Sequence, residues 1–98
     1  MFELEISAPA RAELDRLEAD GGMRKRFKAV SKALRLLAAN PRHQSLNTHA
    51  WKGAPCPHGD TLWEAYAENG TPAAFRIFFC YPPGRRGTIC IVAITPHP

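Results

Sequence analysis

Residues 74–81 have the sequence Ala-Phe-Arg-Ile-Phe-Phe-Cys-Tyr, and this stretch decides the fold. Side chains alternate between the two sides of a strand. One side therefore carries Phe75, Ile77, Phe79 and Tyr81, and the other carries Ala74, Arg76, Phe78 and Cys80. Arg76 stands out, because a guanidinium in an aromatic strand must find an anion or reach solvent. The segment is predicted to be a central strand with one chemically unusual position.

Two further strands are predicted beside it, over 62–68 and 88–95. The connections at 69–72 and 82–87 contain Gly and Pro in patterns typical of turns, so the three strands should form an antiparallel meander. An earlier strand is predicted over 2–6, where apolar and acidic residues alternate.

Two helices are predicted between the first strand and the meander. Ser7 is suited to cap the first helix, which should end at Gly21-Gly22. The second has apolar residues at helical spacing from Met23 onward and should stop at Asn40-Pro41. Segment 42–61 is expected to be an irregular loop. The prediction is a two-layer α+β fold: N-terminal strand, helical hairpin, then a three-stranded antiparallel meander.

The chain has 98 residues, enough for a single domain over 1–98. Its formal charge of +4 is unevenly distributed, because residues 21–59 contain eight Lys or Arg and no acid. Such a surface attracts polyanions, either nucleic acid or an acidic protein. The alternative is a solvated helix face compensated by the acidic first helix.

Cysteine content and the N-terminus predict a cytoplasmic protein with free thiols. Cys56, Cys80 and Cys90 lack the spacing of a disulfide framework. Cys80 and Cys90 can face each other across the last hairpin, as small buried side chains. Cys56-Pro57-His58 offers too few ligands for zinc, so we expect no metal and no cofactor. No apolar run approaches the roughly 18 residues of a membrane span.

The chain resembles the RelE/ParE superfamily of type II toxins, in particular its YoeB/RelE-like branch. The resemblance rests on the element order, the cationic helical hairpin and the segments 62–66, 75–79 and 91–98. It implies a RelE-like fold and a cytoplasmic toxin that acts on mRNA at the ribosome. It also implies a cognate antitoxin with an acidic segment over the basic groove. Whether the toxin is a monomer or a homodimer stays open.

In this family the 2′-hydroxyl of RNA attacks the adjacent phosphate. The resemblance implies that Arg76 contacts this phosphate and that His97 acts on the leaving group. Glu64 and Lys52 complete the candidate catalytic set, and the general base is not identified. The candidate RNA-binding residues are His49, Trp51, Tyr66, Arg85 and Arg86.

Each of these assignments has a plainer alternative. Arg76 can pair with Glu64 across the strands, which would leave no free cation for phosphate. His97 can be a tail residue without a role, and Trp51 a core anchor. The alternative functions are a ParE-like toxin that inhibits gyrase without nuclease activity, and a catalytically inactive binding module of the same fold.

Overall fold

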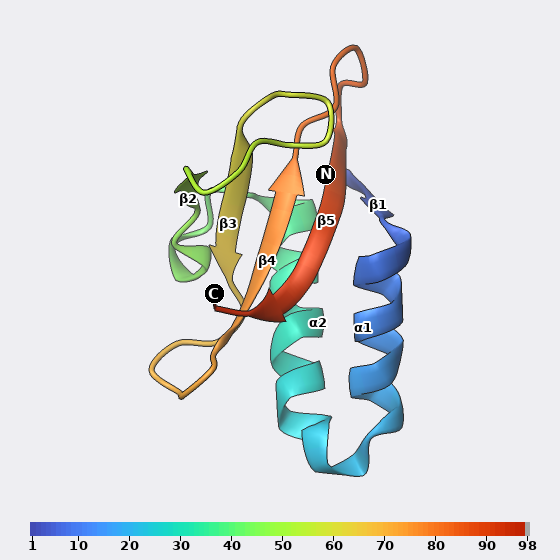
Figure 1. Cartoon of the computed structure of the whole chain (residues 1–98), viewed down its shortest axis with the longest axis vertical. Coiled ribbons are helices and arrows are strands. Elements are labelled where there is room, and N and C mark those ends of the chain that lie inside the picture. Colours follow the sequence, from blue (N-terminus) through green and yellow to red (C-terminus); the bar gives the residue numbers. More distant parts are fainter. Residues whose placement is uncertain (98) are drawn as a thin grey trace.

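The computed structural model describes residues 1–97 and contains two long helices and a five-stranded sheet (Figure 1). The strands are β1 (Glu3–Ile6), β2 (His49–Trp51), β3 (Leu62–Tyr66), β4 (Phe75–Cys80) and β5 (Thr88–Pro96). The helices are α1 (Ala8–Ala19) and α2 (Arg24–Ala39), with short 3₁₀ turns at Gly21–Met23 and Gln44–Leu46. The α+β class is therefore confirmed.

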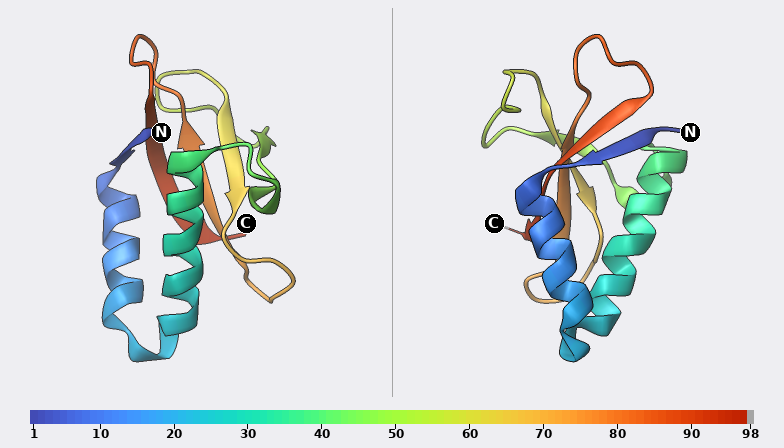
Figure 2. Two further views of the ribbon diagram at one scale, coloured as in Figure 1. Left: turned by 180° about the vertical axis from the view of Figure 1, so that it is seen from behind. Right: turned by 90° about the vertical axis from the view of Figure 1, so that its right-hand side faces the viewer.

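The sheet is mixed and has the order β1-β5-β4-β3-β2. Strands β3, β4 and β5 form the predicted antiparallel meander, while β1 pairs in parallel with β5. The two helices run antiparallel and cover one face of the sheet, as two views of the ribbon make clear (Figure 2). The opposite face is called the outer face below.

Strand β2 corrects the prediction that all of 42–61 is irregular. Its three residues pair antiparallel with β3, so the sheet has one strand more than expected. Three residues are too few to display a period of two in the sequence. Asn47, two residues before the strand, ends the 3₁₀ turn in a left-handed conformation with φ of 48°.

The main core lies between the helices and the sheet. Leu17, Leu37, Phe75, Ile77 and Phe79 are fully or almost fully buried there. The predicted helix cap is confirmed, because the Ser7 hydroxyl accepts a hydrogen bond from the Ala10 amide at 3.2 Å. The same hydroxyl donates to the Val92 carbonyl at 2.8 Å, which ties the start of α1 to β5. Neither helix is long and apolar enough to cross a membrane, within the described part of the chain.

A smaller core lies on the outer face, where loop 52–61 folds over Phe78 and Cys80. Cys56 of this loop forms a disulfide with Cys80, and the two Cα atoms are 6.3 Å apart. The expectation of three free thiols is therefore wrong, and only Cys90 is free. The 24-residue separation gave no signal, because the pairing depends on how the loop crosses the sheet. Cys80 does lie opposite Cys90 in the β4–β5 ladder, as predicted.

The disulfide should stabilise the fold. Closing a loop of this length restricts the unfolded chain, so reduction should lower the free energy of unfolding by about 3 kcal/mol. Urea unfolding with and without a dithiol reductant measures the difference. The matched control is Cys90→Ser, which should leave the effect of the reductant unchanged. Equal stability in both conditions, together with three titratable thiols, would contradict the assignment.

Candidate active site

Six of the residues singled out in the sequence lie on or beside the outer face of the sheet. They are His49, Trp51, Glu64, Tyr66, Arg76 and His97. Strand register brings most of them together, because His49 pairs with Glu64 and Tyr66 pairs with Arg76. Residues directly opposite each other in a ladder share one face, so these four form a continuous patch across β2, β3 and β4.

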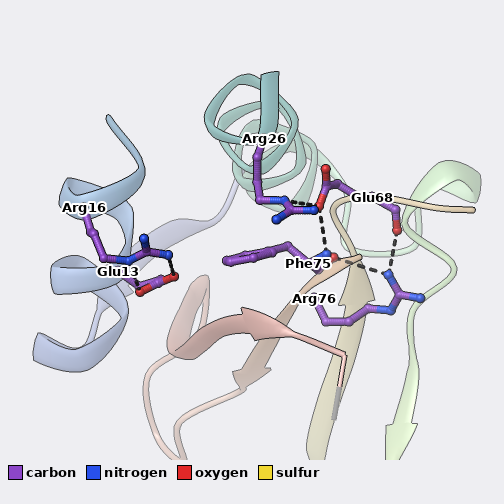
Figure 3. Close-up of polar contacts among 6 residues, drawn as sticks. All are labelled: Glu13, Arg16, Arg26, Glu68, Phe75 and Arg76. Carbon is purple, nitrogen blue, oxygen red and sulfur yellow. Dashed lines mark hydrogen bonds and ion pairs between the residues drawn. The ribbon is translucent and has the colours of Figure 1, made fainter. Parts of the chain in front are cut away.

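Arg76 is almost completely enclosed, with 6% of its surface exposed. Its guanidinium carbon lies 3.7 Å from the centroid of the Tyr66 ring, in cation–π contact. Its Nη1 atom donates to the carbonyl of Glu68 at 2.6 Å and to that of Phe75 at 3.3 Å (Figure 3). Contacts with β3, with the residues that follow it and with β4 therefore hold the Arg76 side chain in place.

The charge partner of Arg76 is Glu64, which is 1% exposed. The Arg76 Nε atom lies 3.8 Å from Glu64 Oε2, an ion pair too long for a hydrogen bond. Neither of these two buried atoms has a hydrogen-bond partner among the described residues. The cross-strand ion pair is therefore the alternative that is observed, and the expectation of Arg76 as an open phosphate ligand is corrected.

His49 engages the other oxygen of Glu64. Its Nε2 lies 2.7 Å from Glu64 Oε1, and its Nδ1 lies 2.8 Å from the carbonyl oxygen of Asn47. A carbonyl can only accept, so Nδ1 carries a proton, and the imidazolium form can donate to both oxygens. The His49 side chain is 43% exposed, and its ring meets Tyr66 edge-on at 5.9 Å between centroids.

This arrangement places the Glu64 carboxylate between the Arg76 guanidinium and the His49 imidazole. With His49 protonated, the line of His49, Glu64 and Arg76 carries a net charge of +1. The anion is buried and the His49 end is open to solvent. A buried carboxylate fixes the positions of the groups on both sides of it, and with His49 protonated the net positive charge favours the approach of an anionic ligand.

Glu68, which sequence reasoning does not single out, fixes the end of the β3–β4 connection (Figure 3). Its Oε1 accepts from Arg26 of α2 at 2.7 Å and from the Phe75 amide at 2.9 Å. Its own carbonyl accepts from Arg76, so this residue links the helical layer to the outer face. In the sequence, Glu68 is marked only as an acid at the end of a predicted strand. Acids are common at such positions, so this feature does not indicate a linking role.

Trp51 and His97 form the aromatic border of the patch. The Trp51 ring packs edge-on against Phe78 at 5.3 Å between centroids, as the core-anchor alternative predicts. A Cβ added to Gly53 would lie 2.5 Å from Trp51 Nε1, so the loop residue must be glycine. The exposed His97 follows β5, and its ring lies 6.4 Å from that of Trp51. The His97 amide donates to the Ala74 carbonyl at 2.9 Å.

The remaining candidates lie apart from this patch. Lys52 is exposed directly after β2 and has no ion pair within residues 1–97. Arg85 and Arg86 lie in the β4–β5 turn, at the end of β4 remote from Arg76. Arg85 is bound to Glu5, with Nη1 2.7 Å from Oε1. The hydrogen bonds from Arg85 lower the pKa of the Glu5 carboxyl. Arg85 thus stabilises the contact between the turn and β1.

Comparisons with known proteins give no family for this chain. No model of a known protein family matches it, and no curated protein matches its sequence. Over residues 1–97, no three His, Cys, Asp or Glu side chains gather closely enough to hold a metal ion. The geometry of the outer face therefore carries the functional argument.

The buried ion pair should contribute to stability only as a pair. Glu64→Gln leaves a buried guanidinium without its anion, and should lower the free energy of unfolding by roughly 3 kcal/mol. Adding Arg76→Met should recover part of this loss, because the unpaired charge is removed. Urea unfolding of the two single variants and the double variant measures the coupling.

Glu13→Gln is the matched control, because Glu13 forms an exposed ion pair with Arg16, 2.6 Å apart on α1 (Figure 3). Such a pair is expected to change stability by about 0.5 kcal/mol or less. Additive losses for Glu64 and Arg76 would contradict the buried pair.

Proposed function

We propose that this chain is a toxin of a type II toxin–antitoxin system, of the RelE/ParE kind, and cleaves mRNA on the ribosome. The observation that carries the proposal is the line from Arg76 through Glu64 to the exposed His49, flanked by Tyr66 and Trp51. Residues for acid–base chemistry, anion attraction and base stacking thus lie together on one face.

The proposed reaction is attack of a 2′-hydroxyl on the adjacent phosphate. It needs a base for the hydroxyl proton, an acid for the departing 5′ oxygen, and positive charge near the phosphate. His49 acts as the acid through Nδ1, which exchanges its contact with the Asn47 carbonyl for the departing 5′ oxygen, while Nε2 stays on Glu64. His97, exposed on the other side of Trp51, acts as the base, which departs from the leaving-group role that the resemblance implies.

Arg76 has a different role from the one implied by the resemblance. The Arg76 guanidinium is enclosed behind the Tyr66 ring. Arg76 therefore serves as a positioning residue for Glu64, and it contributes a buried positive charge beneath the surface of the outer face. Glu64 in turn holds the His49 ring in place. Tyr66 and Trp51 provide flat surfaces beside the histidines on which unstacked bases can pack.

The cationic helix α2 supports binding to ribosomal RNA or to an acidic antitoxin segment. Five of its basic residues are exposed and form no ion pair with the described part of the chain: Arg24, Lys25, Lys28, Lys32 and Arg35. Phosphates or carboxylates would bind such a surface and be displaced by salt.

The enclosed Arg76 also favours a second candidate. A toxin that inhibits gyrase by binding, or an inactive binding module of the same fold, needs no free guanidinium on this face. In either case the outer face would be a protein-binding surface, and changes at His97 would not affect the outcome.

The test is a cleavage assay in a translating extract. The unmodified protein should cut message on the ribosome, and His49→Ala or His97→Ala should each slow cleavage about 100-fold, the usual contribution of one acid or base. His97 is exposed and the His49 side chain is 43% exposed, and urea unfolding of each variant separates a loss of folding from a loss of activity.

His58→Ala is the matched control, because His58 lies in loop 52–61 and faces Asp60, with Nε2 3.4 Å from Oδ2. It should cleave at the unmodified rate. Intact message with all proteins would refute the nuclease proposal, and DNA damage that depends on gyrase would support the second candidate.

A further inference from the structure

A cavity lies on the side of the sheet opposite the candidate active site. It has a volume of about 480 Å³ and is bordered by the chain that follows α2, and by β3 and the end of β4. Its lining includes Arg42, His43, Thr48, Trp63 and Tyr81. A volume of this size suits a small ligand.

One wall of this cavity is aromatic. The Trp63 and Tyr81 rings meet edge-on with 6.3 Å between centroids. Tyr81 is 40% exposed, and its ring also contacts Phe2 and Phe79 at 6.2 and 5.7 Å. Three aromatic neighbours hold Tyr81 in position while leaving part of it accessible. A fixed and partly exposed ring is a suitable surface for stacking a nucleobase.

The other wall is cationic. Arg42 forms no ion pair within the described chain. Burial raises the pKa of the Tyr81 hydroxyl, and the nearby positive charge of Arg42 partly opposes this rise. The His43 Nδ1 atom accepts a hydrogen bond from the Ser45 amide at 3.2 Å and lies 2.8 Å from the Ser45 hydroxyl. This contact fixes the imidazole and leaves Nε2 for a ligand. No carboxylate lines the cavity.

We propose that this cavity binds one nucleotide of a single-stranded RNA, with the base against Tyr81 and Trp63 and the phosphate at Arg42 and His43. An acidic peptide would use only the cationic wall, whereas a nucleotide uses both walls. The proposal that this RNA is the cleaved strand rests on the proposed function. Thr48 lines the cavity and His49 belongs to the outer face, so the strand would pass around the edge strand β2.

Titration of the whole protein with uridine 5′-monophosphate, followed by amide and indole NMR signals, tests the proposal. Signals of 42–48 and of the Trp63 indole should shift. Arg42→Ala should weaken binding about tenfold, as expected for a lost hydrogen bond to a charged group. Uridine without phosphate should bind more weakly by a similar factor. Tyr81→Leu should weaken binding, and Tyr81→Phe should preserve it.

Arg11→Ala is the matched control, because it removes the same charge from the exposed side of α1, and it should bind like the unmodified protein. The measurement is independent of cleavage, because uridine 5′-monophosphate has no internucleotide phosphodiester bond to cut. Shifts confined to the outer face, equal weakening by Arg11→Ala, or tighter binding of a hexaglutamate peptide at 42–48 would each overturn the proposal. Normal nucleotide binding by a protein that fails to cleave message would refute the nuclease function alone.

Discussion

The outer face depends on one buried carboxylate. Glu64 lies in the middle strand of three and contacts Arg76 on one neighbour and His49 on the other. A carboxylate that is 1% exposed is stable only with charged or hydrogen-bonding partners, so its presence fixes both neighbours. Edge strand β2 has only three residues, and this contact adds to its few ladder bonds. The site and the edge of the sheet are therefore stabilised by the same side chain.

The two faces of the sheet have different roles: the helix side forms the main core, and the outer face carries the candidate active site. Aliphatic and aromatic side chains on the helix side form the main core, and Glu68 with Arg26 connects that layer to Arg76. On the outer face, the disulfide between Cys56 and Cys80 holds loop 52–61 over Phe78. Trp51 packs between this loop and His97, so the closed loop supports the aromatic border of the site.

The long periodic segments of the sequence predict most of the fold, whereas the contacts of the candidate site depend on short or irregular segments that show no periodicity. Alternation over 74–81 correctly separated the two faces of β4, and Ser7 correctly marked the start of α1. Strand β2 is too short for periodicity to reveal, so its register against β3 cannot be predicted from the sequence. The contact between His49 and Glu64 depends on that register and cannot be predicted either. The pairing of Arg76 with Glu64 was one of two alternatives, because a sequence gives neither the register nor the depth of burial. The disulfide was missed because loop 52–61 has no regular structure from which its path could be derived.

The central claim is that His49 and Glu64 act as one unit. It is tested most directly by a double-variant cycle on the cleavage rate, with His49→Ala, Glu64→Gln and the two combined. If Glu64 acts through His49, the double variant should be about as slow as His49→Ala alone, because residues that form a unit are not additive. Losses that multiply in the double variant, or a Glu64→Gln protein that cleaves at the unmodified rate, would contradict the account.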